Sequence, residues 1–214
     1  MVMALSPHGR ESALPVLALP SAPRLVVHGI DDPRRTEVEA FIRQVFARRY
    51  GADVRRFAPT LVSVQDQDEI VAAAGYRCAA DETLFLERYL PAPVESLLAF
   101  QHDDGPARRS IVEVGHLAAA RPGAGRHLIG LIGSHLAEQD FSWVVCTLTL
   151  GLRQLFTRIG VAPLALGVAD PALLGADVGH WGSYYDHRPI VLAGQLGKAL
   201  RSLAPSASFP KGLQ

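Results

Sequence analysis

The chain has 214 residues, a length that suits one medium-sized α/β domain with a hydrophobic core of its own. Its 21 Lys and Arg residues balance its 21 Asp and Glu residues, so the net charge gives no indication of a nucleic-acid partner. Cys78 and Cys146 lie far apart in apolar runs, which predicts buried, reduced thiols rather than a disulfide framework. Neither the cysteines nor the histidines have the spacing of metal ligands, so no metal is expected.

Composition divides the chain into three parts. Residues 1–22 are rich in Pro, Ser and Ala and are expected to be a flexible N-terminal leader, residues 23–203 a single domain, and residues 204–214 a C-terminal tail. Pro15 and Pro20 interrupt the apolar stretch of the leader, so no signal peptide is predicted. No run approaches the roughly 18–20 apolar residues that span a bilayer. We therefore expect a cytoplasmic protein without membrane contact.

The first half of the chain predicts both strands and helices. Apolar residues recur at helical spacing over residues 36–50, where Thr36 and Glu39 fit a capping box and Gly51 marks the end. Residues 84–90 fit no single type of element. The other predicted elements are a strand over 24–28, a hairpin with strands over 60–64 and 69–76, and a helix that starts at Pro91 and Pro93 and includes Phe100.

The second half alternates strands with helices. The predicted elements are a strand over 110–117, a helix marked by apolar residues from Leu128 to Leu136, a buried strand over 141–149, a helix from Leu152 to Ile159, and strands over 164–168 and 189–192. A continuous apolar strand is typical of a sheet that is covered on both faces. The order of elements predicts a mixed α/β sheet flanked by helices.

A glycine-bearing turn, ARPGAGRH, joins the strand over 110–117 to the following helix. Glycine lets the backbone approach a ligand closely, and the first turn of a helix has unpaired N–H groups that bind anions. Arg121 and Arg126 flank the turn and are suited to pair with phosphates. The turn is neither a P-loop nor a Rossmann fingerprint, because the spacing of both motifs is missing. A plain connection between strand and helix is the alternative.

The order of strand, turn, helix, buried strand and second helix resembles the GNAT acyltransferase superfamily. The window from Ala120 to Gly125 matches the form Gln/Arg-x-x-Gly-x-Gly/Ala at its two glycines, although Ala120 stands at the leading position. Phe156 stands where the superfamily has a tyrosine that protonates the leaving thiolate, and a phenyl ring cannot donate a proton. The resemblance implies that the parallel strands diverge beyond the turn and open a slot for the pantetheine arm. It also implies that the pyrophosphate of coenzyme A lies on Arg121, Gly123, Ala124, Gly125 and Arg126.

A closer resemblance covers most of residues 24–196. The chain is similar to the thermostable hemolysin family, whose name implies membrane lysis and whose fold is acyltransferase-like. The strand IVEVGHLA also resembles, more loosely, a strand of the acyl-homoserine-lactone synthases, which take acyl groups from acyl carrier protein. The segments that carry the family resemblance are RRYGADVRRFAPTLV, AAAGYRCAADETLFLERYL, IVEVGHLA, TLTLGLRQLFTRIG and WGSYYDHRPIVLAG.

Two candidate catalytic residues lie in the strand before the turn. If Ile111 faces the core, Glu113 faces the same way, because side chains alternate along a strand. A carboxylate there needs a partner or a raised pKa, which suits a general base or an amine-orienting group. The alternative is a structural ion pair with Arg77 or Arg109. His116 is a candidate base near neutral pH, with a packed imidazole as the alternative.

Two further candidates lie elsewhere. Glu87, in the segment DETLFLERYL, is placed on the acceptor side by the GNAT resemblance and is suited to receive a cationic amine; the alternative is a solvated charge beside Arg88. Tyr184, in the segment WGSYY, offers a phenol that can replace the missing tyrosine as general acid. An aromatic plug formed with Trp181 and Tyr185 is the alternative there.

Together these observations predict a GNAT-like domain that moves an acyl group from acyl-CoA or acyl carrier protein to a small-molecule amine. One alternative is a membrane-active protein of the hemolysin type, as the family name suggests. The other is a catalytically silent GNAT-shaped binding protein, which Phe156 favours. A Ser-His-Asp hydrolase is not indicated, because the sequence has no Gly-x-Ser-x-Gly motif.

Overall fold

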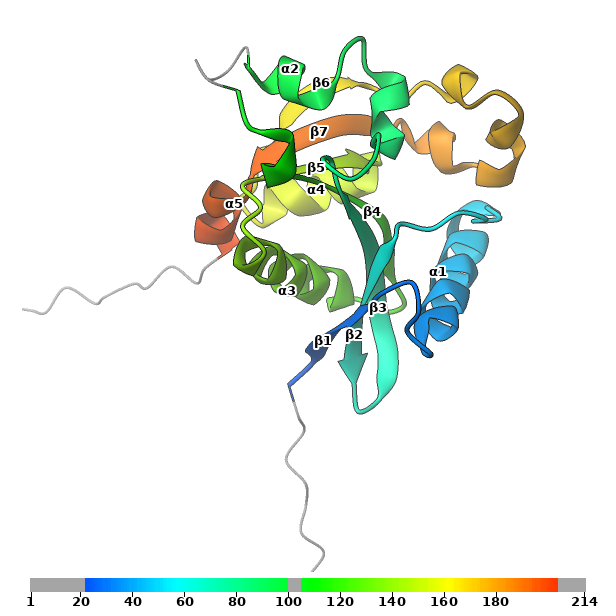
Figure 1. Cartoon of the computed structure of the whole chain (residues 1–214). Coiled ribbons are helices and arrows are strands. Elements are labelled where there is room, and N and C mark those ends of the chain that lie inside the picture. The colour runs from blue at the N-terminus through cyan, green and yellow to red at the C-terminus, as the bar shows by residue number, and fades with distance from the viewer. Residues whose placement is uncertain (1–21, 100–104, 204–214) are drawn as a thin grey trace, which may run out of the picture.

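The protein is built around one seven-stranded sheet with the strand order β1-β2-β3-β4-β5-β7-β6 (Figure 1). The computed structural model describes residues 22–99 and 105–203, so Phe100, the expected tail and the expected leader up to residue 21 lie outside the described residues. Among the described strands only β4 and β5 pair in parallel, and every other pair of neighbours is antiparallel. In chain order the strands are β1 (Arg24–His28), β2 (Thr60–Asp66), β3 (Glu69–Cys78), β4 (Ile111–Ala119), β5 (Trp143–Leu148), β6 (Leu164–Val168) and β7 (Ile190–Gln195).

Helices cover both faces of the sheet. Leu61 and Ala73 pack in one core cluster with α1, whereas Val62 and Ala74 pack in another with α3, because successive residues of a strand face opposite sides. The α-helices are α1 (Arg35–Tyr50), α2 (Val94–Ala99), α3 (Ala124–Glu138), α4 (Leu150–Arg158) and α5 (Leu196–Leu203). The 3-10 segments are η1 (Phe85–Tyr89), η2 (Arg108–Ser110), η3 (Pro171–Trp181) and η4 (Tyr184–His187). The mixed α/β sheet flanked by helices is therefore confirmed.

The start of α1 differs from the prediction. The N-cap residue is Arg34, and no side chain caps the helix, so the expected capping box of Thr36 and Glu39 is wrong. The carboxylate of Glu39 instead accepts hydrogen bonds from Arg35 at 3.0 Å and from Arg43 at 3.4 Å. The predicted end is confirmed, since Gly51 caps the helix with a φ of 65°.

The sequence analysis missed α5, which follows β7 directly. Leu196 is buried, and Leu200 approaches Gly133 of α3 so closely that a Cβ there would lie 3.1 Å from it. Apolar residues at positions 196, 199, 200 and 203 carry the helical period that indicates this helix.

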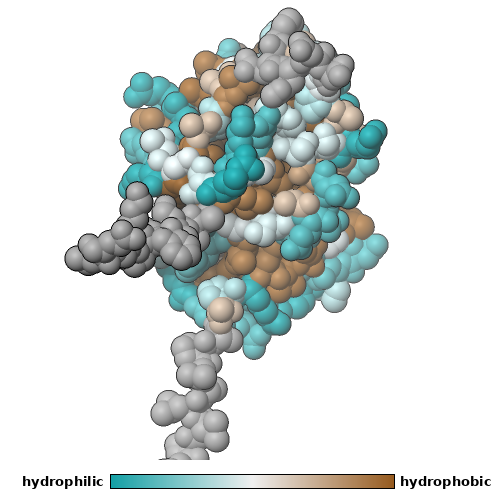
Figure 2. All heavy atoms as spheres, turned by 90° about the vertical axis from the view of Figure 1, so that its left-hand side faces the viewer, coloured by the Kyte–Doolittle hydropathy of each residue, from teal (hydrophilic) through white to brown (hydrophobic). Residues whose placement is uncertain are grey.

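Figure 2 faces the side of the molecule that is on the left in Figure 1, where hydrophobic and hydrophilic residues are interspersed over the surface.

The parallel pair β4–β5 diverges part-way along its length. Residues 111–113 of β4 pair with residues 143–145 of β5, and within the described residues no further pair follows, although β4 continues to Ala119. Against β3, the register of β4 shifts between Gly115 and Ala118, which places an extra residue in β4. His116 lies in this β-bulge with a φ of 54°. The expected divergence of the two strands is thus present and leaves an opening in the sheet.

No helix within residues 22–99 and 105–203 combines the length and the apolar character needed to cross a membrane.

Candidate functional site

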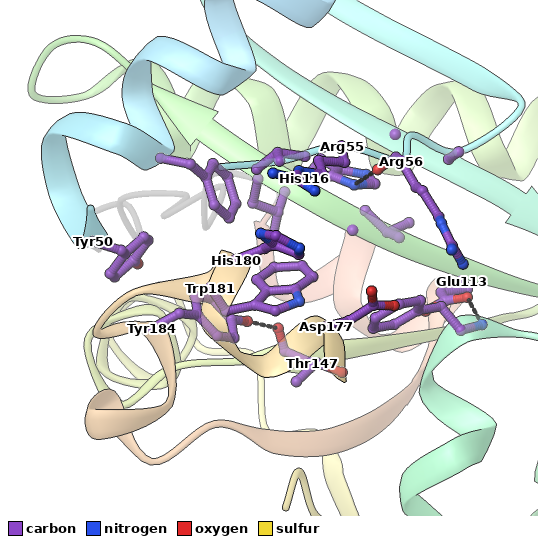
Figure 3. Close-up of a pocket in the computed structure, with 18 of the residues that line it drawn as sticks. Tyr50, Arg55, Arg56, Glu113, His116, Thr147, Asp177, His180, Trp181 and Tyr184 are labelled. Carbon is purple, nitrogen blue, oxygen red and sulfur yellow. Dashed lines mark hydrogen bonds between the residues drawn. The ribbon is translucent and has the colours of Figure 1, made fainter. Parts of the chain in front are cut away.

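A cavity of about 240 Å³ lies at the opening between β4 and β5 (Figure 3). Residues 113–117 of β4 form one side, and Thr147 of β5 and Leu152 of α4 lie across the opening. The end of α1, the segment over 53–58, η1 and the η3–η4 region complete the wall. Segments that are distant in sequence therefore meet around one preformed space, as is usual for small-molecule sites.

Aromatic rings form much of this wall. The ring centroids of Tyr50 and Tyr184 are 5.2 Å apart, and those of Trp181 and Tyr184 are 5.3 Å apart. The hydroxyl groups of Tyr89 and Tyr185 lie 2.5 Å apart and share a hydrogen bond. The aromatic residues that line the cavity are Phe46, Tyr50, Phe85, Tyr89, Trp181, Tyr184 and Tyr185. Such a wall suits an apolar or cationic group of a ligand. The expected aromatic cluster of Trp181, Tyr184 and Tyr185 is present and forms part of it.

The η3–η4 region is joined to the end of α1 by backbone hydrogen bonds. The Ser183 N–H donates to the carbonyl of Tyr50 at 2.8 Å, and the Asp53 N–H donates to the carbonyl of His180 at 2.7 Å. Between them Gly182 passes so close that an added Cβ would lie 2.1 Å from the Tyr50 oxygen. Only glycine fits there, and this contact closes one end of the cavity wall.

Glu113 projects from β4 into the cavity wall and faces the same side as buried Ile111, as predicted. Its carboxylate accepts hydrogen bonds from the backbone N–H groups of Phe85 at 2.7 Å and Leu86 at 3.1 Å. It also forms the expected ion pair with Arg77, at 3.4 Å. Burial raises the pKa of Glu113, and the nearby guanidinium opposes this without cancelling it. The residue therefore anchors η1 to β4 and is at the same time an acidic group at the opening.

Tyr184 places its hydroxyl at β5, beyond the last residue that pairs with β4. The hydroxyl donates to the carbonyl of Thr147 at 3.3 Å (Figure 3). Burial raises the pKa of Tyr184 well above its usual range, with the neighbouring Tyr50 and Tyr89 adding to it. The phenol is therefore protonated at neutral pH, and its single O–H points to the Thr147 carbonyl at the opening of the sheet.

His116 lies in the bulge and lines the cavity. Its Nε2 lies 3.1 Å from the carbonyl oxygen of Arg56, so this nitrogen carries the proton and donates it. Nδ1 is then an unprotonated acceptor, and it is buried with no hydrogen-bond partner in the described part of the chain. A Cβ on Gly75 would lie 3.1 Å from it. Burial lowers the pKa of His116 to about 4, so the imidazole is neutral at pH 7.

Glu87 does not line this cavity. Its carboxylate accepts hydrogen bonds from Arg108 at 2.7 and 2.9 Å and from the N–H groups of Leu84 and Val94 at 2.9 and 3.1 Å. Burial alone would raise the pKa of Glu87, but the hydrogen bonds from Arg108 and the two N–H groups outweigh it and hold the pKa below its usual range. In this arrangement Glu87 joins η1, α2 and η2, and its acceptor positions are occupied.

The glycine turn follows β4 directly after the residues that line the cavity. Gly123 is the N-cap of α3 with a φ of 85°, and no side chain caps the helix. Ala124 and Gly125 form its first residues, so N–H groups of its first turn lack a side-chain acceptor. Arg121 forms an ion pair with Asp66, whereas Arg126 is exposed and forms no ion pair with another described residue.

Phe156, at the position of the expected tyrosine, packs in apolar surroundings. It lies against Leu148 and Leu192 in one cluster and against Ile129 and Ile159 in another. No group of three or more His, Cys, Asp or Glu side chains that could hold a metal ion occurs among the residues that the structure describes.

The sequence analysis did not single out several residues of the cavity wall. Tyr50, Tyr89 and Arg56 have no local motif, because each reaches the cavity from a different element, and Arg77 was named only as an ion-pair partner of Glu113. A signal was nevertheless present. All of them lie in segments RRYGADVRRFAPTLV and AAAGYRCAADETLFLERYL, which carry the family resemblance.

The model of a family described as thermostable hemolysin matches residues 28–200. This chain belongs to the thermostable hemolysin family. No curated protein sequence is significantly similar to this member of the family.

Solved structures of other proteins share the fold. The chain is similar to the AHL synthase LasI at 15% identity, with 86% of this chain and 96% of that chain covered and a TM-score of 0.57. It is similar to FeeM, an N-acyl amino acid synthase from uncultured soil microbes, at 13% identity, 86% and 97% coverage and a TM-score of 0.58. It is also similar to BjaI, a CoA-dependent acyl-homoserine lactone synthase solved with SAM and isopentyl-CoA, at 11% identity, 85% and 88% coverage and a TM-score of 0.58. At these identities the similarity is one of fold, and this chain has the expected GNAT-like fold.

Proposed function

We propose that this protein is an acyltransferase that moves an acyl group from a thioester, acyl-CoA or acyl carrier protein, to a small-molecule amine. The observation that carries the proposal is the aromatic-walled cavity at the point where β4 and β5 stop pairing. A thioester arm that enters this opening meets an amine held in the cavity, and such positioning supplies much of the acceleration of a reaction between two bound molecules. The synthases of similar fold, one of them solved with isopentyl-CoA, support an acyl donor of this kind.

The donor lies along the glycine turn and the first turn of α3. The N–H groups at Gly123 and Gly125 and the positive end of the helix dipole receive its phosphates. The Ala124 N–H joins them on leaving the Arg121 carbonyl, to which it donates at 3.3 Å. Arg126 follows the turn directly and has no ion-pair partner among the described residues, so its guanidinium is free to bind a phosphate. Arg121 binds a phosphate as well once its ion pair with Asp66 opens. The same surface suits the phosphopantetheine of a carrier protein, so both donors remain in the proposal.

In the proposed reaction the amine nitrogen attacks the thioester carbonyl carbon, the C–N bond forms and the C–S bond breaks. Glu113 takes the proton that the amine loses, directly or through a water molecule, and its raised pKa suits this role. Tyr184 turns its O–H from the Thr147 carbonyl to the departing thiolate and gives it a hydrogen bond or a proton, the role that Phe156 cannot fill. His116 is neutral and holds Arg56 by its carbonyl, which gives it a supporting place at the bulge. The products are an amide and a free thiol.

Release of free thiol from a panel of acyl-CoA and acyl carrier protein donors, each with a panel of small amines, tests the proposal. We expect amine-dependent thiol release with at least one donor. If no donor binds and no thiol is released, the acyltransferase function is wrong. Tight donor binding without turnover would instead identify the silent binding protein.

A further inference from the structure

The segment between α1 and β2 is irregular but firmly held. Residues 51–58 have no regular secondary structure. Even so, carbonyl oxygens along the segment accept hydrogen bonds from side chains of α1 and β4. The donors and the residues whose carbonyls they bind are Arg43 with Val54, His116 with Arg56, and Arg35 with Ala58, at 2.8 to 3.1 Å. The backbone that carries the cavity-lining Arg55 and Arg56 is therefore fixed in place.

Most charged side chains that line the cavity compensate one another. Arg55 pairs with Asp53 at 2.7 Å, and Arg77 pairs with Glu113 at 3.4 Å. Arg56 and Asp177 are left over, because neither forms an ion pair or a side-chain hydrogen bond with any residue in 22–99 or 105–203. The cavity lining therefore carries one uncompensated cation and one uncompensated anion.

These two charges belong to different walls of the cavity. Arg56 belongs to the segment held by His116, and Asp177 belongs to η3 (Figure 3). A guanidinium binds a carboxylate through two parallel hydrogen bonds, which makes arginine the side chain best suited to select a carboxylate. A carboxylate and an amino group are the two ligand groups whose charges are complementary to Arg56 and Asp177.

We propose that the amine acceptor is an amino acid, with its carboxylate on Arg56 and its amino group on the side of Asp177. The identity of this ligand as the acceptor rests on the proposed function, whereas its binding does not. The aromatic wall then faces the side chain of the amino acid, so apolar or aromatic side chains are preferred.

Isothermal titration of the purified full chain, with no thioester present, tests the proposal. Each common L-amino acid is compared with its own carboxamide, which keeps the amine and the side chain but loses the carboxylate charge. We expect at least one amino acid to bind about ten-fold more tightly than its amide, the size expected for a charged hydrogen-bonded pair. Arg56→Gln abolishes this difference, whereas Arg55→Gln, whose guanidinium is already paired with Asp53, retains it.

The proposal is wrong if no amino acid binds better than its amide, or if Arg56→Gln leaves the difference intact. Because the titration contains no acyl donor, its result does not depend on whether thiol is released. An amino acid that binds through Arg56 without thiol release in any donor assay would refute the acyl transfer and leave the ligand class standing. Thiol release with simple amines, without any preference for amino acids, would support the acyl transfer and refute the amino acid as the acceptor.

Discussion

Gly182 offers a sharp test of how the cavity wall is built. An alanine Cβ at this position would lie 2.1 Å from the carbonyl oxygen of Tyr50, and 2.8 and 2.9 Å from the carbonyl carbon and oxygen of Gly51. These atoms belong to the backbone at the end of α1, so no side-chain rotation relieves the overlap. The backbone at Gly182 also has φ 50° and ψ −130°, a conformation that side chains other than glycine rarely adopt.

Both effects destabilise a Gly182→Ala variant. Backbone strain costs on the order of 1–3 kcal/mol, and the overlap costs about 1–3 kcal/mol after relaxation. The smaller conformational entropy of unfolded alanine offsets about 0.4–1 kcal/mol. The expected net loss is therefore about 1–6 kcal/mol, a large share of the roughly 5–15 kcal/mol that stabilises an ordinary domain.

Urea unfolding, followed by circular dichroism, measures this loss as a lower midpoint at unchanged slope. Gly179→Ala is the matched control, since it lies in the same region, has no atom within 4 Å of its added Cβ and has no positive φ. The control should stay within about 0.5 kcal/mol of the wild type, or gain slightly. A Gly182→Ala variant as stable as the control would show that the η3–η4 region does not close against α1 in this way.

The remaining predictions concern residues that the sequence proposed as catalytic. Glu87→Gln should lower the free energy of unfolding by about 1–3 kcal/mol, because it weakens the hydrogen bonds with Arg108, and should leave thiol release per folded molecule unchanged; normal stability with lost activity would contradict this. His116→Asn should flatten the pH dependence of stability. In the folded protein the pKa of this imidazole is lowered to about 4 from its usual 6.5. Its contribution to the free energy of unfolding is therefore complete above about pH 6.5 and is lost as the pH falls towards 4. Identical acid-unfolding profiles of the variant and the wild type would refute this prediction. Tyr184→Phe should slow thiol release by about 100-fold or more, at a cost of about 1 kcal/mol in stability for the lost bond to Thr147. Tyr185→Phe is its control, and equal rates in the two variants would remove Tyr184 from the reaction.

Much of the fold followed from the sequence. The strand over 24–28 and the end of α1 at Gly51 were predicted to the residue, because periodicity and a glycine C-cap are local properties. The capping box at Thr36 failed for the opposite reason. Glu39 had charged partners in Arg35 and Arg43, and a sequence motif does not show which of several competing partners a carboxylate will take.

In the candidate site, too, local features could be predicted and contacts between distant segments could not. The sequence by itself determined the strand that carries Glu113, the fact that Glu113 and Ile111 share a face, and the glycine turn before α3, since each depends on alternation or on a helix start. Only the tertiary structure decided that Glu113 and Tyr184 line the same cavity. It also decided that Glu87 lies outside this cavity, where its carboxylate is hydrogen-bonded to Arg108. It also brought Arg56 to the cavity wall. The physical reason is that a cavity is formed where strands stop pairing, and pairing between segments distant in the chain leaves no local pattern in either of them.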